Sequence, residues 1–489
     1  MKNTTTTTRP FRVVIVGGGL LGLTAAHIFA KTDIDFVVLE QHDNLMPELG
    51  SLLLLIPSTF RILDQLGILD AIEPALMRND RGVFMSATDG TVWKDEEVHH
   101  IVAANHGHGV RVSHRPRYVE ALYNSLPAAA KAKTHVRKQV VRVEVNDDGV
   151  AVHCADGTVE RGDMVLGADG VHSRTRQAMQ SLAAGLPSDT PQPSPYTTTY
   201  RAMFGNLPVI PDLPPAVSYE GAAAGVSTQI LTGSQCSWFI LYEKLDTPTK
   251  ERMRWTDADK AAMLERWGHL HMAPGYTLQR AYECRQAPVG LISLEEGLLD
   301  KWSWKRMVLV GDAVRKIVPH TGLGYNTGVM DLVELANRLR RLTLAKTTAT
   351  TTADLETLFA DYQIARMRDT PTVMDISQQR ARMCAWLSPW HWFMARVLMP
   401  WLPLATYTIQ YVLGPIIARS PVLEWLDEKN LPAGAMPYIH YPRTEAEAKE
   451  EKSEEGRRRN NGNVLADPSS RSQLLARTFS SLRRWRRLD

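Results

Sequence analysis

Cysteine is scarce in this sequence, with four residues among 489. Cys154, Cys236, Cys284 and Cys384 lie far apart, so they form neither a close metal-binding pair nor a disulfide framework. This usage is typical of a reducing compartment. The sequence also lacks a Ser-His-Asp arrangement, a paired-carboxylate motif and a metal-binding motif. None of the usual hydrolytic or metal-assisted mechanisms is therefore predicted.

An excess of charge of one sign is missing as well. The net charge is +3, so no general affinity for nucleic acid follows. Hydrophobic residues make up 44% and charged residues 22% of the chain, which are ordinary values for a globular protein of two or three domains. Residues 1–10 are threonine-rich and lack the apolar core of a secretory signal, and we expect them to be disordered.

The strongest motif lies near the start of the chain. Residues 13–16 are apolar and β-branched, as in a buried parallel strand. Gly17, Gly19 and Gly22 follow with the Gly-x-Gly-x-x-Gly spacing. In a dinucleotide-binding unit the first glycine makes the tight turn and the second lets a pyrophosphate approach the backbone. The third lets the next helix pack on the strand.

The residues that follow complete the same unit. Residues 20–31 predict a helix whose N-terminus would favour a phosphate, and residues 36–39 predict a second strand. Glu40 ends that strand, where an acidic residue can hydrogen-bond ribose hydroxyls. The alternative is a glycine-rich turn that binds nothing. The unit alone does not distinguish FAD from NAD.

Two later stretches repeat this kind of pattern. Residues 162–170 form a short apolar strand followed by glycines and Asp169, a second place where backbone would meet a ligand. Residues 306–310 predict another buried strand, which Gly311 and Asp312 end. A ligand that reaches both ends of the chain implies a discontinuous first domain with a second domain inserted.

The domain boundaries follow from changes in pattern. The predicted fold class is α/β, with a Rossmann-like domain in two parts and an inserted β-sheet domain. The two parts span residues 11–182 and 293–345, the sheet domain spans 196–292, a helical region spans 353–430, and a polar, mostly disordered tail spans 440–489.

A histidine-rich stretch lies within the first part. It contains His99, His100, His106, His108 and His114. No cysteine joins them and their spacing matches no metal motif, so we interpret the stretch as a surface loop rather than a metal site.

The segment 384–417 is unusually apolar. Residues 397–418 are 22 residues without an ionisable side chain, long enough as a helix to cross a membrane. We predict membrane attachment through this segment, as a single-pass span or a monotopic anchor. The arginine-rich residues 471–489 would lie on an anionic surface. The alternative is a pair of helices in the protein's own fold, buried or covering a ligand.

The three glycine-acid stretches together resemble the class A flavoprotein monooxygenases, which share the fold of p-hydroxybenzoate hydroxylase. The resemblance covers roughly residues 11–180 and 300–345. The chain is most similar to a fungal branch that epoxidises or hydroxylates prenylated meroterpenoid and indole-diterpene intermediates. The similar features are residues 62–67, residues 199–205 and the apolar C-terminal segment.

The resemblance implies that the two-part domain binds FAD. Glu40 would bind the adenosine ribose, Gly50 and Arg115 would lie along the FAD, and Asp312 would hydrogen-bond the ribityl chain. The backbone from Gly322 through Gly324 to Tyr325 would meet the isoalloxazine at a helix N-terminus. Asp169 would lie near the FAD pyrophosphate and the path of NADPH.

Three positions depart from the family pattern. Residues 51–56 form a leucine run where many relatives have small residues. Arg315 stands where aromatic hydroxylases often have histidine. Tyr325 occupies a place usually held by Gly or Ala, so its side chain must point away from the flavin ring.

The resemblance also implies the activity. In this family NADPH reduces FAD, and dioxygen then supplies the oxygen atom that passes to the substrate. Arg201 and Tyr219 best match the active-site arginine and tyrosine of the fungal branch, where they would stabilise negative charge during oxygen transfer. Their alternative roles are an exposed strand arginine and a tyrosine packed at a domain seam.

The predicted function is an NADPH- and FAD-dependent monooxygenase acting on a large apolar, prenylated substrate in secondary metabolism. One alternative is a soluble phenol hydroxylase of the same fold. Another, from a different class, is a flavin-free binding protein on this scaffold, like the GDP dissociation inhibitors of prenylated GTPases. The colour of the purified protein would separate that last alternative from the first two.

Overall fold

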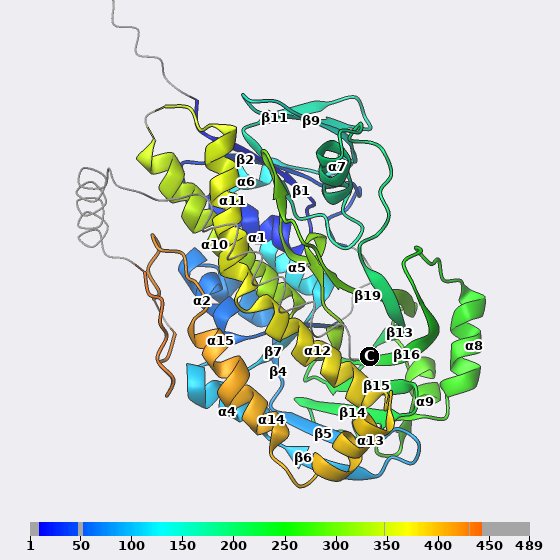
Figure 1. Cartoon of the computed structure of the whole chain (residues 1–489). Helices are drawn as coiled ribbons and strands as arrows, with labels where there is room; N and C mark the ends of the chain where they lie inside the picture. Colours follow the sequence, from blue (N-terminus) through cyan, green and yellow to red (C-terminus); the bar gives the residue numbers. More distant parts are fainter. Residues whose placement is uncertain (1–8, 47–51, 347, 430, 443–489) are drawn as a thin grey trace, which may run out of the picture. The chain divides into compact units, whose positions relative to one another are not determined.

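A computed structural model describes residues 9–46, 52–346, 348–429 and 431–442 (Figure 1). Gly50 lies outside the described residues, as do most of the predicted disordered ends and the arginine-rich residues 471–489.

A six-stranded sheet combines the two parts of the predicted FAD-binding domain. Its order is β20-β21-β12-β1-β2-β8, with all neighbours parallel except β20 and β21. The strands are β1 (Arg12–Val16), β2 (Asp35–Leu39), β8 (Thr134–His135), β12 (Met164–Gly167), β20 (Ser303–Trp304) and β21 (Met307–Leu309). Because β21 pairs directly with β12, the strand after the insertion returns to the first part of the domain. The prediction of a discontinuous α/β domain is confirmed.

Helices pack around this sheet. The helix α1 (Leu20–Phe29) follows the glycine loop, and α10 (Gly324–Ala345) packs against α1. The other helices and turns of this region are α2 (Pro57–Leu66), α3 (Leu69–Ile72), η1 (Glu73–Ala75), α5 (Arg115–Asn124), α6 (Ala128–Lys131), α7 (Arg174–Ala183) and α11 (Thr352–Met367). The strand, helix and strand predicted over residues 13–39 are all present.

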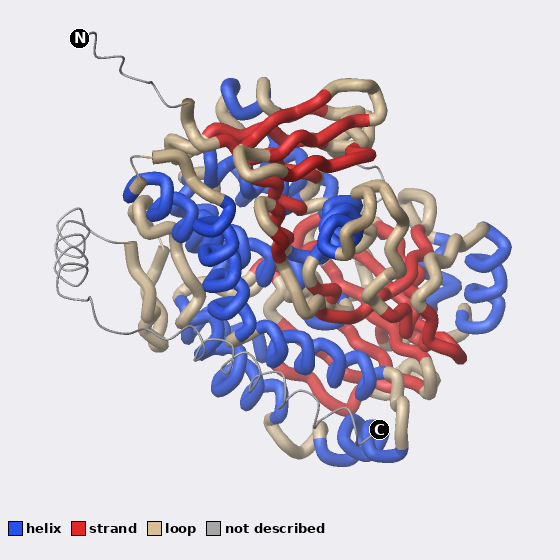
Figure 2. Tube along the Cα trace, turned by 45° about the horizontal axis from the view of Figure 1, so that its top comes forward, coloured by secondary structure: helices blue, strands red, loops and turns tan. Residues whose placement is uncertain are grey.

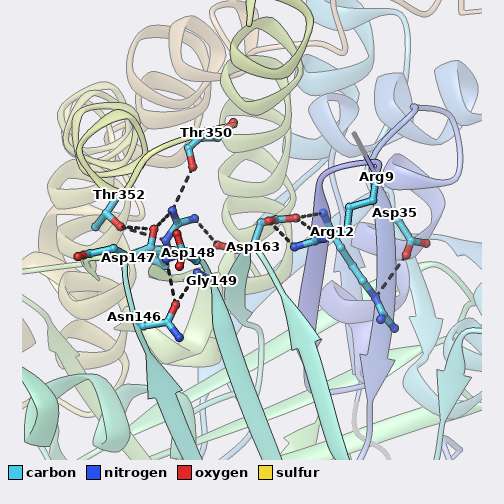
Figure 3. Close-up of polar contacts among 11 residues, drawn as sticks. Arg9, Arg12, Asp35, Asn146, Asp147, Asp148, Gly149, Asp163, Thr350 and Thr352 are labelled. Carbon is cyan, nitrogen blue, oxygen red and sulfur yellow. Dashed lines mark hydrogen bonds and ion pairs between the residues drawn. The ribbon is translucent and has the colours of Figure 1, made fainter. Parts of the chain in front are cut away.

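The buried Arg306, between β20 and β21, joins the two parts of the FAD-binding domain. Its guanidinium donates to the carbonyl oxygens of Asp163 and Thr350, both at 3.0 Å, and to Thr352 Oγ1 at 3.0 Å. It also donates to the Asp147 carbonyl. Figure 3 shows these acceptors together. One cation therefore joins three segments that are distant in the sequence.

An eight-stranded sheet forms the second layer, and its strands are in the large group of red tubes toward the lower right of Figure 2. Its order is β22-β19-β13-β16-β15-β14-β5-β6. The strands are β5 (Arg81–Ser86), β6 (Val92–Glu96), β13 (Thr197–Leu207), β14 (Val217–Ala223), β15 (Val226–Thr232), β16 (Ser237–Thr249), β19 (Gly290–Leu298) and β22 (Arg315–Lys316).

This sheet is larger than the range 196–292 expected for it. Strands β5 and β6 come from inside the range expected for the first FAD-binding part, and β5 pairs in parallel with β14. A parallel pairing between strands more than a hundred residues apart leaves no local signal in the sequence.

The two faces of the eight-stranded sheet have different neighbours. One face packs on α8 (Asp257–Trp267) and α9 (Leu278–Glu283) in an apolar core that includes Val217, Met203 and Leu241. The other face looks toward α12 (Thr370–Cys384), which contacts β14 and β15. Since side chains alternate along a strand, neighbouring residues belong to opposite faces.

Smaller sheets complete the fold. One contains β3 (Leu52–Leu55), β7 (Arg111–His114) and β4 (Leu76–Arg78), another contains β9 (Val140–Val145), β10 (Val150–Cys154) and β11 (Val159–Gly162), and a third pairs β17 (His271–Ala273) with β18 (Tyr276–Thr277).

The histidine-rich stretch is not a surface loop. It forms α4 (Val98–His106) and part of β7, and His106 is buried at 1% exposure against Tyr438. The sequence does carry a helical signal that the prediction did not use, because Val98, Ile101 and Val102 have the i, i+3, i+4 spacing of one helix face. Across the described ranges, no group of three or more His, Cys, Asp or Glu side chains is placed to hold a metal.

The apolar C-terminal segment folds into short helices. They are α13 (Pro389–Phe393), the π-helical turn η4 (Met394–Leu398), α14 (Leu404–Tyr407), the π-helical turn η5 (Thr408–Leu413) and α15 (Gly414–Ala418). The yellow and orange ribbons in Figure 1 show them following α12.

The single-pass membrane prediction is wrong. Among the described residues, none of the helices has both the length and the apolar character needed to cross a membrane. The run between Val397 and Ala418 is interrupted at Pro400 and Pro403, because η4 ends just before Pro400 and α14 begins just after Pro403. The side chains of Met399, Ile409 and Leu413 line a cavity instead. The segment covers part of the protein's own interior, which is the alternative given above.

Candidate active site

A cavity of about 1620 Å³ lies between the six-stranded sheet, the eight-stranded sheet and α12. It opens at the carboxyl ends of β1, β2 and β12, where parallel α/β sheets bind their ligands. The predicted site residues that line it are Gly17, Gly19, Glu40, Arg115, Asp169, Asp312, Gly324 and Tyr325. We call the group Gly17, Gly19, Glu40, Arg115 and Asp312 the dinucleotide cradle.

The glycine loop has the geometry that the spacing predicts. Gly17 has φ +103°, and a Cβ there would lie 2.7 Å from the Ala168 carbonyl oxygen. A Cβ on Gly22 would lie 1.8 Å from the Gly17 carbonyl oxygen, so α1 packs directly on the loop. A Cβ on Gly19 would meet nothing within 4 Å. The loop is therefore closed toward the protein at Gly17 and Gly22 and open toward the cavity at Gly19.

Glu40 holds this loop in place. One carboxylate oxygen accepts the Gly18 N–H at 2.7 Å, and the other accepts the His42 N–H at 2.9 Å. Each carboxylate oxygen has a second lone pair. Glu40 therefore shapes the loop and still has acceptor capacity for ribose hydroxyls on the cavity side.

Arg115 begins α5 and lines the cavity. Its guanidinium makes no hydrogen bond or ion pair with any other residue that the structure describes. Burial lowers its pKa, and the nearby Asp312 carboxylate partly opposes this effect. Arg115 is exposed to the cavity, and a cation without a partner among the described residues fits the negative charge of a pyrophosphate.

Both carboxylate oxygens of Asp169 accept hydrogen bonds from the residues that follow it. One of its oxygens accepts the Ser173 hydroxyl at 2.5 Å, and the other accepts the Thr175 N–H at 2.9 Å. Burial raises its pKa, and these hydrogen bonds oppose that rise. The carboxylate therefore positions the start of α7 at the edge of the cavity. Its predicted place near a pyrophosphate and NADPH stays a prediction.

Asp312 lies in the short turn η2 (Gly311–Ala313) and accepts a hydrogen bond from Lys316 Nζ at 2.5 Å. The Gly311 N–H donates to the buried Asp331 at 3.0 Å. Asp331 also pairs with Arg315 at 2.8 Å and with Arg366 at 2.9 Å. Arg315, which stands where aromatic hydroxylases often have histidine, is thus buried below the loop and does not reach the cavity.

The N-terminus of α10 faces the cavity at Gly324. The Tyr325 hydroxyl lies 3.0 Å from Thr24 Oγ1 and 3.2 Å from the Tyr118 hydroxyl. Its ring is therefore directed between α1 and α5, away from the space in front of the helix. The departure at Tyr325 leaves the α10 N-terminus free for a ligand.

The cavity continues along one face of the eight-stranded sheet. We call these cavity-facing side chains the sheet wall; its apolar members are Phe84, Ala202, Phe204, Leu231, Ile240, Ile292 and Leu294. On the opposite side, α12 and the segment after it contribute Ile376, Met383, Met399, Ile409 and Leu413. This part of the cavity is suited to an apolar ligand.

A few polar side chains interrupt the apolar surface. Arg380 and Glu220 form an ion pair at 2.6 Å, with the guanidinium 4.3 Å from the centre of the Phe84 ring. The Tyr242 hydroxyl donates to Gln229 Oε1 at 3.0 Å. These four groups pair with one another.

The structure does not support the predicted roles of Arg201 and Tyr219, because both lie on the far face of the sheet. Arg201 pairs with Glu243 at 2.5 Å and lies over Trp255, and neither Arg201 nor Tyr219 lines the cavity. Tyr219 is packed in the core with α8 and α9. Their neighbours Ala202 and Glu220 face the cavity instead.

Sequence reasoning missed several polar cavity residues, among them Glu220, Tyr242, His320 and Arg380. No motif marks them, and the strand alternation would place Glu220 on the cavity face only once the face of one neighbour is known.

The residues of the cradle fit FAD. The glycine loop has space at Gly19 on its cavity side, Arg115 is a cation without a partner in the described part of the chain, and the helix N-terminus at Gly324 lines the cavity. Fold and site therefore define a dinucleotide-binding flavoprotein. Residues 11–190 and 283–356 match the FAD binding domain family and together make up more than half of the chain.

Named relatives narrow the class. The chain is 31% identical over 426 residues to the FAD-dependent monooxygenase srdH of Neurospora crassa, covering 84% of this chain and 94% of that protein. It is 31% identical over 382 residues to the FAD-dependent monooxygenase ausM of Penicillium brasilianum, covering 76% and 79%. The chain belongs to this family of FAD-dependent monooxygenases.

Solved structures agree on the fold. A salicylate hydroxylase in complex with its substrate superimposes with a TM-score of 0.63 at 18% identity, covering 84% of this chain and 95% of that chain. The HpxO protein of Klebsiella pneumoniae in complex with FAD and uric acid also has a TM-score of 0.63 at 18% identity, covering 83% and 95%.

Proposed function

We propose that this monooxygenase uses NADPH and dioxygen to hydroxylate or epoxidise a large apolar substrate, of the prenylated kind, in secondary metabolism. The observation that carries the proposal is the continuity of one cavity from the dinucleotide cradle to the sheet wall. The cavity of about 1620 Å³ is larger than a pocket for one ligand, which has about 300–1,000 Å³, and the apolar side chains of the wall suit a substrate with few polar groups. The named fungal relatives are FAD-dependent monooxygenases, which supports the type of reaction.

When bound, FAD supplies the redox chemistry that activates dioxygen. The residues of this chain bind, orient and exclude water. Arg115 would neutralise the pyrophosphate, Glu40 would accept from ribose hydroxyls, and Asp312 would accept from the ribityl chain. The positive end of the α10 dipole at Gly324 would stabilise negative charge on the ring system.

The sheet wall and α12 would hold the substrate in a space with little water. Excluding water limits side reactions that would compete with oxygen transfer to the substrate. The Glu220–Arg380 pair leaves no net charge there, so it does not oppose the entry of an apolar molecule. The Gly311–Asp331 hydrogen bond keeps the Asp312 turn fixed relative to α10.

Purification and turnover test the proposal. The protein should be yellow, should oxidise NADPH faster than NADH, and should add one oxygen atom to a prenylated aromatic or terpenoid compound, as read by mass spectrometry. NADPH oxidation that no apolar compound stimulates, combined with stimulation by simple phenols, would overturn the substrate class and leave the flavin assignment intact.

A further inference from the structure

We propose that Gln229 and Glu220 together bind a hydroxyl group of the substrate. The Gln229 amide donates a hydrogen bond to the hydroxyl oxygen, and the Glu220 carboxylate accepts a hydrogen bond from the O–H. This inference rests on the proposed function and adds a feature to the substrate class: one hydroxyl at a fixed position on an otherwise apolar skeleton.

The two side chains are neighbours on the cavity face of the eight-stranded sheet. Gln229 on β15 lies directly opposite Glu220 on β14 in the antiparallel register, so both side chains leave the sheet on the same side. Both residues line the cavity. Both are partly exposed although β14 and β15 are interior strands of the sheet, so the surface that they expose is cavity surface.

The orientation of the Gln229 amide is fixed by Tyr242. Gln229 Oε1 accepts the Tyr242 hydroxyl at 3.0 Å. Burial raises the pKa of Tyr242, so this hydroxyl keeps the proton that it donates. An amide whose oxygen is used in this way presents its NH2 group on the other side. Gln229 Nε2 has no hydrogen-bond partner among the residues that the structure describes, and it is not a fully buried atom. It is therefore a donor that a ligand can reach.

Glu220 supplies the matching acceptor. Its oxygen Oε2 accepts from Arg380 Nε at 3.0 Å, from Arg380 Nη2 at 2.6 Å and from the Cys384 thiol at 3.6 Å. The other oxygen, Oε1, has no partner in the described part of the chain and is not fully buried. The side chain of Glu220 keeps 19% of its surface exposed. The ion pair with Arg380 thus holds the carboxylate in place and leaves one oxygen for a ligand.

A donor beside an acceptor selects the kind of oxygen group. A hydroxyl accepts one hydrogen bond and donates another, so it can use both side chains. A ketone or an ether has no O–H and would use only the Gln229 amide. A carboxylate would bring a second negative charge next to Glu220, which is unfavourable. The site is therefore suited to an alcohol or a phenol.

The position of the pair relative to the proposed flavin site is also fixed. The Tyr242 ring stacks on His320 with a centroid distance of 3.9 Å and an interplanar angle of 29°. His320 lies in the short turn η3 (Pro319–Thr321), which leads to Gly324, where the isoalloxazine is proposed to lie. A hydroxyl bound to the pair would thus set which carbon of the substrate faces the flavin.

Binding of matched probes to the holoenzyme tests the inference. One series is 5α-androstane, 3β-methoxy-5α-androstane and 5α-androstan-3β-ol, and the other is farnesene, farnesyl methyl ether and farnesol. Dissociation constants are read from the change in flavin absorbance and, independently, from tryptophan fluorescence. The preference is the dissociation constant of the hydrocarbon divided by that of the alcohol. In at least one series it should be roughly tenfold larger in the wild type than in Gln229→Met.

The variants separate the amide from its surroundings. Gln229→Met has a side chain of similar length without the donor. Gln229→Met combined with Tyr242→Phe replaces it if the single variant does not fold, because the double variant leaves no hydroxyl unpaired. Tyr242→Phe alone lets the amide rotate and should lower the preference in part. The matched control is Gln286→Met, which should bind every probe like the wild type, since Gln286 is exposed and lies outside the cavity.

Two outcomes overturn the inference: neither series shows a preference that the Gln229 variants lose, or the methyl ether binds the wild type as tightly as the alcohol in the series that shows it. The second outcome would exclude Glu220 as the acceptor. Failure of the proposed function is separate, because a protein that purifies without flavin is recognised by its colour. Tryptophan fluorescence would still report on Gln229 in that case.

Discussion

The dinucleotide cradle and the sheet wall bound the same cavity but recognise their ligands in different ways. The cradle relies on backbone geometry: a left-handed glycine at 17, an open glycine at 19 and a helix N-terminus at Gly324. The wall relies on side chains from strands that are far apart in the sequence. A cradle of this kind suits a cofactor that never changes, whereas a side-chain wall can be altered one residue at a time to suit a substrate.

We expect the largest effect from a substitution that distorts the backbone of the cradle. Gly22→Ala places a Cβ 1.8 Å from the Gly17 carbonyl oxygen, so α1 must move away from the strand. We expect a loss of roughly 3 kcal/mol or more in the free energy of unfolding, with loss of FAD. Urea denaturation and flavin content measure both quantities.

The matched control is Gly19→Ala, which meets nothing within 4 Å and has a φ of −74°. It should unfold like the wild type within about 0.5 kcal/mol and bind FAD more weakly. Equal destabilisation by the two alanines would contradict the geometry of the loop.

Acid should lower the free energy of unfolding through His320, which lies on the wall side of the cavity. The pKa of His320 is lowered to about 3, below the usual value of 6.5, so the unfolded chain takes up a proton that the folded chain does not. The stability contribution is complete above pH 6.5 and is lost as the pH falls below it. From this group we expect the free energy of unfolding to fall by about 1.4 kcal/mol per pH unit between pH 6.5 and 4.5.

Comparison with His320→Gln isolates this slope, because glutamine does not titrate. Thermal or urea unfolding from pH 7 to 4.5 should show a shallower decline in the variant. Parallel declines would mean that His320 is protonated in the folded protein.

Adjacent residues on opposite faces of β14 sharpen the comparison. Glu220→Gln removes the charge that compensates Arg380 in the cavity, and we expect it to lower the free energy of unfolding by about 1–3 kcal/mol. Tyr219→Phe removes only a hydroxyl on the far face and should change it by less than about 0.5 kcal/mol. The reverse order of these two effects would place the wrong face toward the cavity.

The same contrast explains how much was predictable from sequence. The strand at 13–16, the helix at 20–31 and Glu40 follow each other within thirty residues, so local rules locate them. The face of a strand depends on its partners, and a shift of one residue exchanges Tyr219 for Glu220. The parallel pairing of β5 with β14 and the folding of the apolar segment over the cavity depend on contacts across the whole chain.

Some cavity residues had no local signal for a related reason. His320 and Arg380 come from a turn and a helix more than fifty residues apart, and the packing of α12 against the turn brings them to the same cavity. Arg315 shows the converse, since a position that suggested a cavity side chain is occupied by a buried partner of Asp331.

The central claim is that the cradle binds the cofactor and that the far face of the eight-stranded sheet does not. FAD titration of two arginine variants tests this claim most directly. Arg115→Met removes the unpaired cation, and Arg201→Met leaves Glu243 paired with Arg266 at 2.6 Å. We predict one FAD per wild-type chain, a roughly 10–100-fold weaker dissociation constant for Arg115→Met, and an unchanged one for Arg201→Met. Equal weakening in both variants, or a wild-type chain that takes up no FAD, would contradict it.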